Sequence, residues 1–324
     1  MEVYKHVNGD HMNLIIQIPC YNEAKTLAGT IADLPKEVEG FESVEVLVID
    51  DGSDDETADV ARKSGADHVV SIFQNSGLAN AFAVGLEKAL RLGADVIVNT
   101  DADNQYKGEC ITDLVKPILE GDADIVIGDR QTHSIAHFSA AKKLLQKFGS
   151  WVVRWTSGTG VPDATSGFRA LSRDAALQIV VFSTYTFTLE TVIQAGKRGL
   201  NVVSIPIETN PMQRESRLIR SIPRYIILSA ITIFRIFVMY EALRVFVTIG
   251  SVMFGLGLIL SFRFVFFFML GEGNGHIQSL ILASILLVFG FQAFLLGILG
   301  DLISKNRRLS EETLYRLKKQ QLDQ

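Results

Sequence analysis

Short apolar segments alternate with amphipathic stretches through the first 130 residues of the chain. Several apolar segments are hydrophobic on both faces, which is typical of parallel strands covered by helices. Strands and helices alternating at this spacing predict an α/β fold with a doubly wound, mostly parallel sheet. The predicted strands cover residues 14–18, 44–49, 68–72, 95–100 and 124–127, and the predicted helices cover 24–34, 55–64, 78–92 and 109–120.

The segment 137–155 has a different pattern. Apolar and aromatic residues recur at three- and four-residue steps, while Lys143, Lys147 and Arg154 fall on the other side. One interpretation is a helix that packs its apolar face on the core. The other is an interfacial helix with aromatics in the lipid boundary and lysines on anionic headgroups. The segment alone favours the first interpretation, and the C-terminal segments favour the second.

Two long apolar runs lie near the C-terminus. Residues 245–262 contain no charge, residues 264–270 extend that run past Arg263, and residues 277–300 are also uncharged. Crossing a hydrocarbon core of roughly 30 Å takes about 20 apolar residues, so each run predicts a transmembrane helix. The segment 216–241 mixes arginines with apolar residues and is expected to lie along the membrane surface.

Charge asymmetry predicts the orientation of these helices. The loop 271–276 contains no Lys or Arg, whereas six basic residues follow Asp301. The positive-inside bias places that tail in the cytoplasm, and two crossings return the chain to the same side. We therefore expect a cytoplasmic catalytic domain over 1–215, a juxtamembrane helix over 216–241, two transmembrane helices over 242–303 and a basic cytoplasmic tail over 304–324.

Composition narrows the functional classes further. The formal net charge of −5 gives no support for a nucleic-acid partner. The two cysteines show no metal or disulfide spacing, which suits a reducing compartment. The first thirteen residues lack an apolar core, so no secretory signal is expected. Homo-oligomerisation through the transmembrane helices stays open.

The most informative chemistry follows the strand predicted at 95–100. It delivers Asp101 and Asp103 at its carboxyl end, where open α/β sheets bind ligands. Two such carboxylates can converge on Mg²⁺ or Mn²⁺, which commonly carries phosphates, although the pair alone is equally consistent with a solvated loop. Acidic loops also follow the first two strands, and neither a dinucleotide-binding nor a P-loop glycine motif is present.

Taken in order, these motifs resemble family 2 glycosyltransferases with a GT-A fold. Two later motifs and the paired apolar runs make the chain similar to the polyprenyl-phosphate branch, which includes dolichol-phosphate mannose synthase and undecaprenyl-phosphate glucosyltransferases. The motifs are Pro19-Cys20-Tyr21-Asn22-Glu23, Asp50-Asp51-Gly52-Ser53, Asn75-Ser76-Gly77, Asp101-Ala102-Asp103-Asn104-Gln105, Asp163-Ala164-Thr165-Ser166-Gly167-Phe168-Arg169 and Arg214-Glu215-Ser216-Arg217.

The resemblance implies a role for each of these positions. The implied nucleotide-sugar-binding residues are Pro19, Tyr21, Glu23, Asp50, Asp51, Asn75, Asp101 and Asp103. The implied metal ligands are Asp101, Asp103 and Gln105, and the implied catalytic residues are Asp103, Arg130, Asp163 and Arg169. The implied acceptor-phosphate residues are Arg130, Ser166, Arg169, Arg214, Ser216 and Arg217.

The implied reaction is inverting transfer of a hexosyl unit from a nucleotide diphosphate sugar to a polyprenyl monophosphate. Asn104 and Leu78 depart from the usual motifs, which leaves the donor open among UDP-glucose, UDP-N-acetylglucosamine and GDP-mannose. We expect Asp163 to orient the acceptor motif through Arg169, without serving as an obligatory base. The alternatives are a processive polysaccharide synthase, whose Gln-x-x-Arg-Trp motif is missing because Trp151 precedes Arg154, and a non-catalytic membrane scaffold.

Overall fold

The computed structural model describes residues 12–131, 154, 158–181, 187–210, 222–271 and 277–322. The chain forms two compact units, Met1–Ile226 with Leu314–Gln324, and Ile227–Thr313. Apart from Arg154, the helix predicted over 137–155 lies outside the described residues, and so do Arg214, Ser216 and Arg217.

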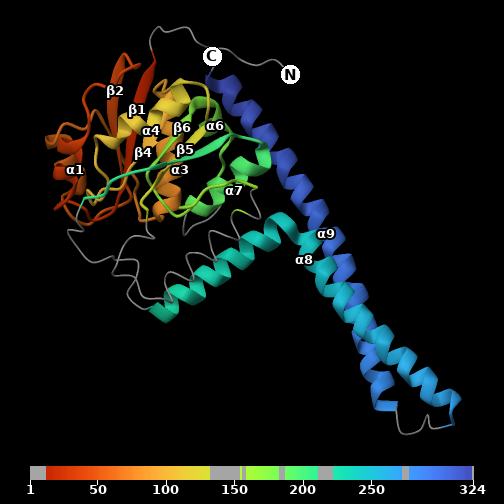
Figure 1. Cartoon of the computed structure of the whole chain (residues 1–324). Coiled ribbons are helices and arrows are strands. Elements are labelled where there is room, and N and C mark those ends of the chain that lie inside the picture. The colour runs from red at the N-terminus through yellow and green to blue at the C-terminus, as the bar shows by residue number, and fades with distance from the viewer. Residues whose placement is uncertain are drawn as a thin grey trace. The chain divides into compact units, whose positions relative to one another are not determined.

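The first unit is built on a seven-stranded sheet in the order β3-β2-β1-β4-β6-β5-β7 (Figure 1). All neighbouring strands pair in parallel except β6, which runs antiparallel to both β4 and β5. This confirms the predicted mostly parallel α/β sheet and adds two strands, β6 and β7, that were not predicted. The strands are β1 (Asn13–Cys20), β2 (Ser43–Asp50), β3 (His68–Ser71), β4 (Val96–Asn99), β5 (Ile125–Asp129), β6 (Arg169–Ser172) and β7 (Val202–Pro206).

Helices cover both faces of this sheet because alternate strand residues point to opposite sides. Leu14 and Ile16 of β1 pack with Ile111 and Leu114 of α4, whereas Gln17 lies against Gly85 of α3. The carboxyl ends of the parallel strands therefore form one edge, lined by the loops that carry the predicted chemistry. The helices of this unit are α1 (Leu27–Asp33), α2 (Thr57–Lys63), α3 (Leu78–Arg91), α4 (Cys110–Leu119), α6 (Arg173–Gln178) and α7 (Thr188–Arg198).

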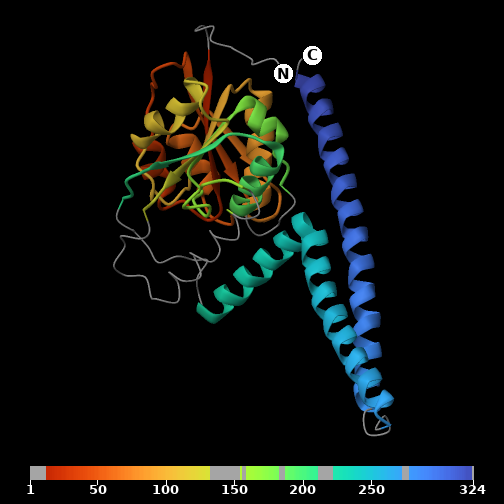
Figure 2. The same cartoon turned by 45° about the vertical axis from the view of Figure 1, so that its right-hand side comes forward.

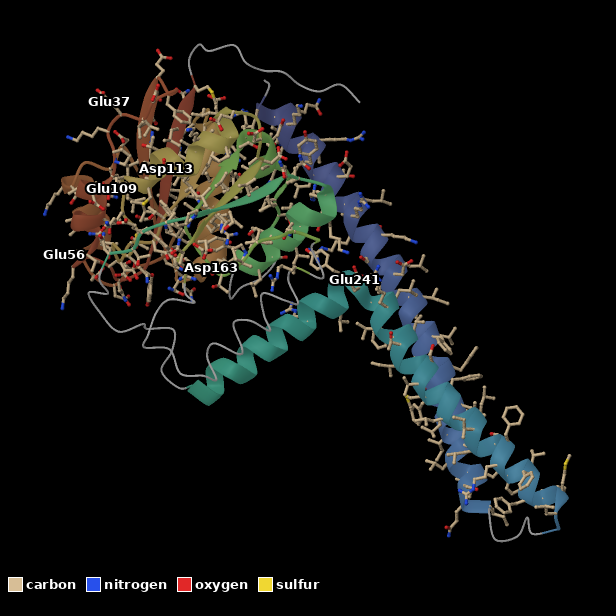
Figure 3. The ribbon with its side chains drawn as sticks, in the orientation of Figure 1. Glu37, Glu56, Glu109, Asp113, Asp163 and Glu241 are labelled. Atoms are coloured by element: carbon tan, nitrogen blue, oxygen red, sulfur yellow. The ribbon has the colours of Figure 1, made fainter. Side chains whose placement is uncertain are left out.

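The second unit consists of most of two long helices, α8 (Ile222–Met269) and α9 (Ile277–Leu322). α8 breaks at Glu241, where φ is −130° and ψ is 34°, and Figure 3 labels this residue at the bend. The break falls at the boundary predicted between the juxtamembrane and transmembrane segments. α9 continues through the segment predicted as a basic tail, so that segment is helical as far as Leu322.

Both helices are long and apolar enough to cross a membrane. Their most apolar windows have mean hydropathies of 2.2 and 2.4, and only 11% and 22% of those windows is buried in the protein. A core helix of a soluble protein with this hydropathy would be mostly buried, because exposing so much apolar surface to water is unfavourable. The exposed apolar surface therefore suits lipid.

Glycines allow the apolar parts of α8 and α9 to pack closely side by side (Figure 2). A Cβ on Gly290 would lie 2.9 Å from the backbone nitrogen of Phe254, and one on Gly250 would lie 2.9 Å from the Gly290 carbonyl oxygen. Small residues at membrane helix contacts let the two backbones approach, which increases van der Waals contact. These glycines therefore serve the contact between the two helices of one chain.

Polar contacts join the same helices near the break in α8. Arg307 of α9 donates from Nη2 to the Tyr240 hydroxyl at 2.9 Å, and its guanidinium lies 4.9 Å from the centre of that ring. Arg307 Nε also donates to Glu311 at 2.8 Å. Arg307 is thus held by an acid and an aromatic ring, and this cluster links the bend of α8 to α9.

We predict that Gly290→Leu destabilises the helix pair, because its side chain would overlap the Phe254 backbone. Overpacking of this kind costs typically about 1–3 kcal/mol. Thermal unfolding of the purified protein in detergent should show a lower midpoint for this variant. Gly255→Leu is the matched control, since a Cβ there meets nothing within 4 Å. Equal midpoints for the two variants would contradict the close glycine packing.

Candidate active site

Three loops interlock at the carboxyl edge of the sheet. The backbone nitrogen of Asn22, after β1, donates to Ser53 Oγ after β2 at 2.9 Å, and Asn22 Oδ1 accepts from the Asp54 nitrogen at 2.9 Å. Gly52 has φ of +69°, and a Cβ on it would lie 2.6 Å from the Asn75 nitrogen. Only glycine fits such a close approach to neighbouring backbone. The loops after β1, β2 and β3 therefore form one cradle.

Two acidic residues predicted to bind the nucleotide accept hydrogen bonds from the loops of this cradle. Asp51 is buried, and its two oxygens accept bonds from the Ser76 nitrogen, the Ser76 hydroxyl and the Gly77 nitrogen at 2.6–2.9 Å. Asp50 is also buried and accepts a bond from the Ser53 nitrogen at 3.1 Å. These bonds show that both carboxylates shape the loops; ribose contact stays a prediction.

The remaining predicted nucleotide residues differ in exposure. Pro19 is buried in β1, and Glu23 is buried with Oε2 accepting from Thr26 Oγ1 at 3.0 Å. Tyr21 and Asn75 are exposed on the cradle. Their exposure makes them the members of this set best placed to meet a ligand from solvent.

The loop after β4 carries the candidate metal residues. Asp101, Asp103 and Gln105 are all partly exposed there, and the Gln105 nitrogen donates to Asp103 Oδ1 at 3.2 Å. Asn104 has φ of +56°, a left-handed conformation that asparagine tolerates better than most residues. This gives a conformational reason for asparagine at a position where the resembling family often has leucine.

The charge pattern of this loop fits a divalent cation. Burial, followed by the charge of Asp103, raises the pKa of Asp101 to about 6. A cation between two such carboxylates would relieve their repulsion. No group of three acidic, histidine or cysteine side chains that could hold a metal exists among the described residues. Two carboxylates suffice for Mg²⁺ or Mn²⁺ when substrate phosphates and water complete the shell.

The segment after β7 is bonded to the loop that carries the candidate metal residues. The Asn210 nitrogen donates to the Gln105 carbonyl at 2.8 Å, and Asn210 Nδ2 donates to the Asn104 carbonyl at 3.1 Å. Tyr106 forms a backbone bridge with Thr209. Sequence reasoning missed Asn210 and Tyr106, because no local motif connects residues separated by a hundred positions.

Arg130 and Asp163 form a two-point ion pair. Arg130 Nε and Nη2 donate to the two oxygens of Asp163 at 2.8 and 3.1 Å, and Nη2 also donates to Thr165 Oγ1. Among the described residues, nothing accepts a hydrogen bond from Arg130 Nη1. Asp163 lies at the loop edge of the unit in Figure 3. One nitrogen of the arginine is therefore available for an anion.

Electrostatics at this pair favour the ionised state of both partners. Burial works to raise the pKa of Asp163, but the bonds from Arg130 and Thr165 outweigh it and lower that pKa. Burial works against the charge of Arg130, but nearby Tyr106 and Asp163 raise its pKa above the ordinary value. A carboxylate held this way is a weak proton acceptor.

Two residues of the acceptor motif, Arg169 and Ser166, are fully buried, and their contact with an acceptor phosphate stays a prediction. Arg169 was expected to contact the acceptor phosphate and to partner Asp163, but it is fully buried in β6 and donates to Thr191 and to the carbonyl of Ser166. Burial lowers its pKa to about 10, which leaves it charged at neutral pH. Ser166 is fully buried too. Arg169 is buried because β6 pairs between β4 and β5 in the sheet, and Arg130 takes the place expected for Arg169 beside Asp163.

The seven-stranded sheet and the acidic loops at its carboxyl edge agree with the resemblance to glycosyltransferases. Residues 15–179, half of the chain, match the sequence model for glycosyl transferase family 2. The chain belongs to this family.

Relatives confirm the resemblance to the polyprenyl-phosphate branch. An undecaprenyl-phosphate mannosyltransferase from Micrococcus luteus is 31% identical over 206 residues, covering 60% of this chain and 83% of that protein. Glycosyltransferase AglJ from Haloferax volcanii is 29% identical over 295 residues, covering 89% of this chain and 92% of that protein. The second match extends into the C-terminal helices.

The fold is shared with a solved enzyme as well. The glucosyl-3-phosphoglycerate synthase of Mycobacterium tuberculosis, crystallised with Mn²⁺, UDP and glucosyl-3-phosphoglycerate, has a TM-score of 0.52 at 22% identity. The similarity covers 68% of this chain and 80% of that one. It shows that the sheet is of GT-A type.

We predict that Mn²⁺ binding to this protein weakens by about tenfold per pH unit below pH 6, because the cation must displace the Asp101 proton. Electron paramagnetic resonance of free Mn²⁺ measures this directly. Asp103→Asn should weaken binding at every pH and move the acidic limb to lower pH, since the charge that raises the pKa of Asp101 is gone. Affinity that stays constant between pH 7 and 5 would contradict the assignment.

Proposed function

We propose that this protein transfers a hexosyl unit, with inversion, from a nucleotide diphosphate sugar to a polyprenyl monophosphate at the cytoplasmic membrane face. The observation that carries the proposal is that both oxygens of Asp163 accept hydrogen bonds from Arg130 or Thr165, while no described residue accepts one from Arg130 Nη1. The undecaprenyl-phosphate mannosyltransferase of Micrococcus luteus, a relative of this chain, supports the same acceptor class.

The chemistry of a phosphate acceptor explains why the reaction does not need the paired carboxylate of Asp163 as a general base. An alcohol must lose a proton as it attacks, so its enzyme benefits from a general base. A phosphate monoester has a second pKa near 6 and is mostly dianionic at pH 7. Such an oxygen needs positioning by cations, and Arg130 offers a planar, charged donor for that purpose.

The proposed step balances without a proton acceptor. An acceptor phosphate oxygen forms a bond to the anomeric carbon, the bond from that carbon to the diphosphate breaks, and the electron pair leaves with the diphosphate. Mg²⁺ or Mn²⁺ held by Asp101 and Asp103 would neutralise the departing charge. Tyr21 and Asn75, exposed on the cradle, are proposed to contact the nucleotide, and Arg130 to hold the acceptor phosphate.

The membrane arrangement follows from the acceptor. We infer that the two apolar helices cross the bilayer, that the 222–241 part of α8 lies at its cytoplasmic surface, and that both termini are cytoplasmic. Protease added from the extracytoplasmic side should leave the chain after Lys305 intact in sealed vesicles. Cleavage there would refute this topology.

The reaction is tested by incubating the purified protein with polyprenyl phosphate, Mn²⁺ and a panel of UDP- and GDP-sugars. Mass spectrometry should find a hexosyl-phosphoryl-polyprenol with one donor preferred. Removal of the metal with EDTA should abolish the product, and Asp103→Asn should remove most of it. Transfer to polymer ends in place of lipid phosphate would favour the processive synthase.

We predict that Asp163→Asn lowers the rate by about 10²-fold through misplaced acceptor phosphate, but keeps the acidic limb of the pH–rate profile. The limb should follow the phosphate pKa when lipid phosphate and Mn²⁺ are both saturating, which removes the contribution of Asp101. Loss of the limb in the variant, or efficient transfer to free polyprenol by the native protein, would make Asp163 a general base.

A further inference from the structure

A row of polar side chains crosses the centre of the sheet. Gln17 of β1, Asn99 of β4 and Arg169 of β6 are all fully buried. Gln17 and Asn99 are register partners, and so are Asn99 and Arg169, so the three side chains share one face of the sheet. Central strands of such sheets are normally apolar on both faces. We call these three residues the buried polar row.

Stability alone does not explain the buried polar row. Gln17 Oε1 and Arg169 Nε have no hydrogen-bond partner in the part of the chain that the structure describes. Buried polar atoms without partners destabilise a core, so the presence of each one needs an explanation other than stability. α3 also accommodates the row with Gly85, where a Cβ would overlap Gln17 Oε1. Local rules are broken in this way mostly where function requires it.

The buried polar row donates hydrogen bonds to the backbone of the acceptor motif. Gln17 Nε2 donates to Asn99 Oδ1 at 2.9 Å, and Asn99 Nδ2 donates to the Gly167 carbonyl at 2.8 Å. Arg169 Nη2 donates to the carbonyl of Ser166 and, at 3.5 Å, to that of Ala164. Three carbonyls of the segment after Asp163 therefore depend on buried donors.

Gly167 connects this segment to the candidate metal residue. A Cβ on Gly167 would lie 2.9 Å from Oδ1 and 3.2 Å from Oδ2 of Asp101, so the carboxylate rests against the bare Cα. The Gly167 nitrogen donates to the Tyr106 hydroxyl at 3.3 Å. Gly167 is thus held at both its nitrogen and its oxygen, and a shift of its backbone would shift Asp101.

We propose that Gln17, Asn99 and Arg169 are positioning residues that couple the metal carboxylate to the acceptor motif through Gly167. The proposal rests on the proposed function, because it gives Asp101 and the segment after Asp163 their roles. Its consequence is that loss of the row weakens the metal site and the acceptor site together. Loss of a group that hydrogen-bonds directly to a metal ligand lowers metal affinity typically by about 10–100-fold, and we expect a loss near the lower end of that range for this more distant row.

The test uses Asn99→Leu, Gln17→Met and the double variant in the full-length protein. Asn99→Leu removes the donor to Gly167, and we expect weaker Mn²⁺ binding by paramagnetic resonance together with a higher KM for lipid phosphate. Gln17→Met leaves the Asn99–Gly167 bond and should have a smaller effect. The double variant replaces both amides by apolar groups, which restores part of the stability that a single change removes. Its Mn²⁺ affinity should nevertheless stay as low as that of Asn99→Leu.

Asn13→Ala is the matched control, since it removes a side-chain bond to Ser43 at the opposite end of β1. It should lower the unfolding midpoint without changing Mn²⁺ affinity. The proposal is overturned if Mn²⁺ affinity follows the unfolding midpoint across all four variants, if Asn99→Leu binds Mn²⁺ normally, or if the native protein binds none. Normal Mn²⁺ binding without transfer to lipid phosphate would instead overturn only the proposed function.

Discussion

The candidate active site is governed by the need to neutralise carboxylates gathered at one buried sheet edge. An ionised carboxylate taken out of water is strongly destabilising unless it is paired or hydrogen-bonded. Asp51 is satisfied by the 76–77 loop and Asp163 by Arg130. Burial, and then the surrounding acids, raise the pKa of the Cys20 thiol and keep it neutral. Within the part of the chain that the structure describes, no ion pair to Asp101 or Asp103 comparable to that of Asp163 is found, and this pair suits a cation.

The residues at this edge fall into two classes, those that shape the site and those that can contact a ligand. Asp50, Asp51, Ser166 and Arg169 are all buried. The side chains of Asp50, Asp51 and Arg169 bond mainly to neighbouring backbone. Tyr21 and Asn75 are exposed, and Arg130 is partly exposed with no acceptor for Nη1 among the described residues. A motif defined by residue type contains both classes. Burial distinguishes them, because a fully buried side chain acts on a substrate only through its neighbours.

The second unit shows a related division between composition and contact. Hydropathy depends on composition alone, and it correctly predicted two long, apolar helices. Lipid offers no hydrophobic driving force between helices, so their association depends on close backbone contact. Gly250 of α8 and Gly290 of α9 provide that contact. Gly255 also lies on α8, but a Cβ added there would meet nothing within 4 Å. Identical residues in one apolar run thus have different roles that only the paired helices reveal.

The sequence by itself determined the mostly parallel α/β sheet, the glycosyltransferase family and the two apolar helices, because these follow from local periodicity, ordered motifs and segment hydropathy. It could not reveal β6, since a four-residue strand that begins with a buried arginine has no strand signature. Only the tertiary structure paired Asp163 with Arg130 and aligned Gln17, Asn99 and Arg169 in one row. Those relations join residues far apart in the chain, and register and burial decide them in three dimensions.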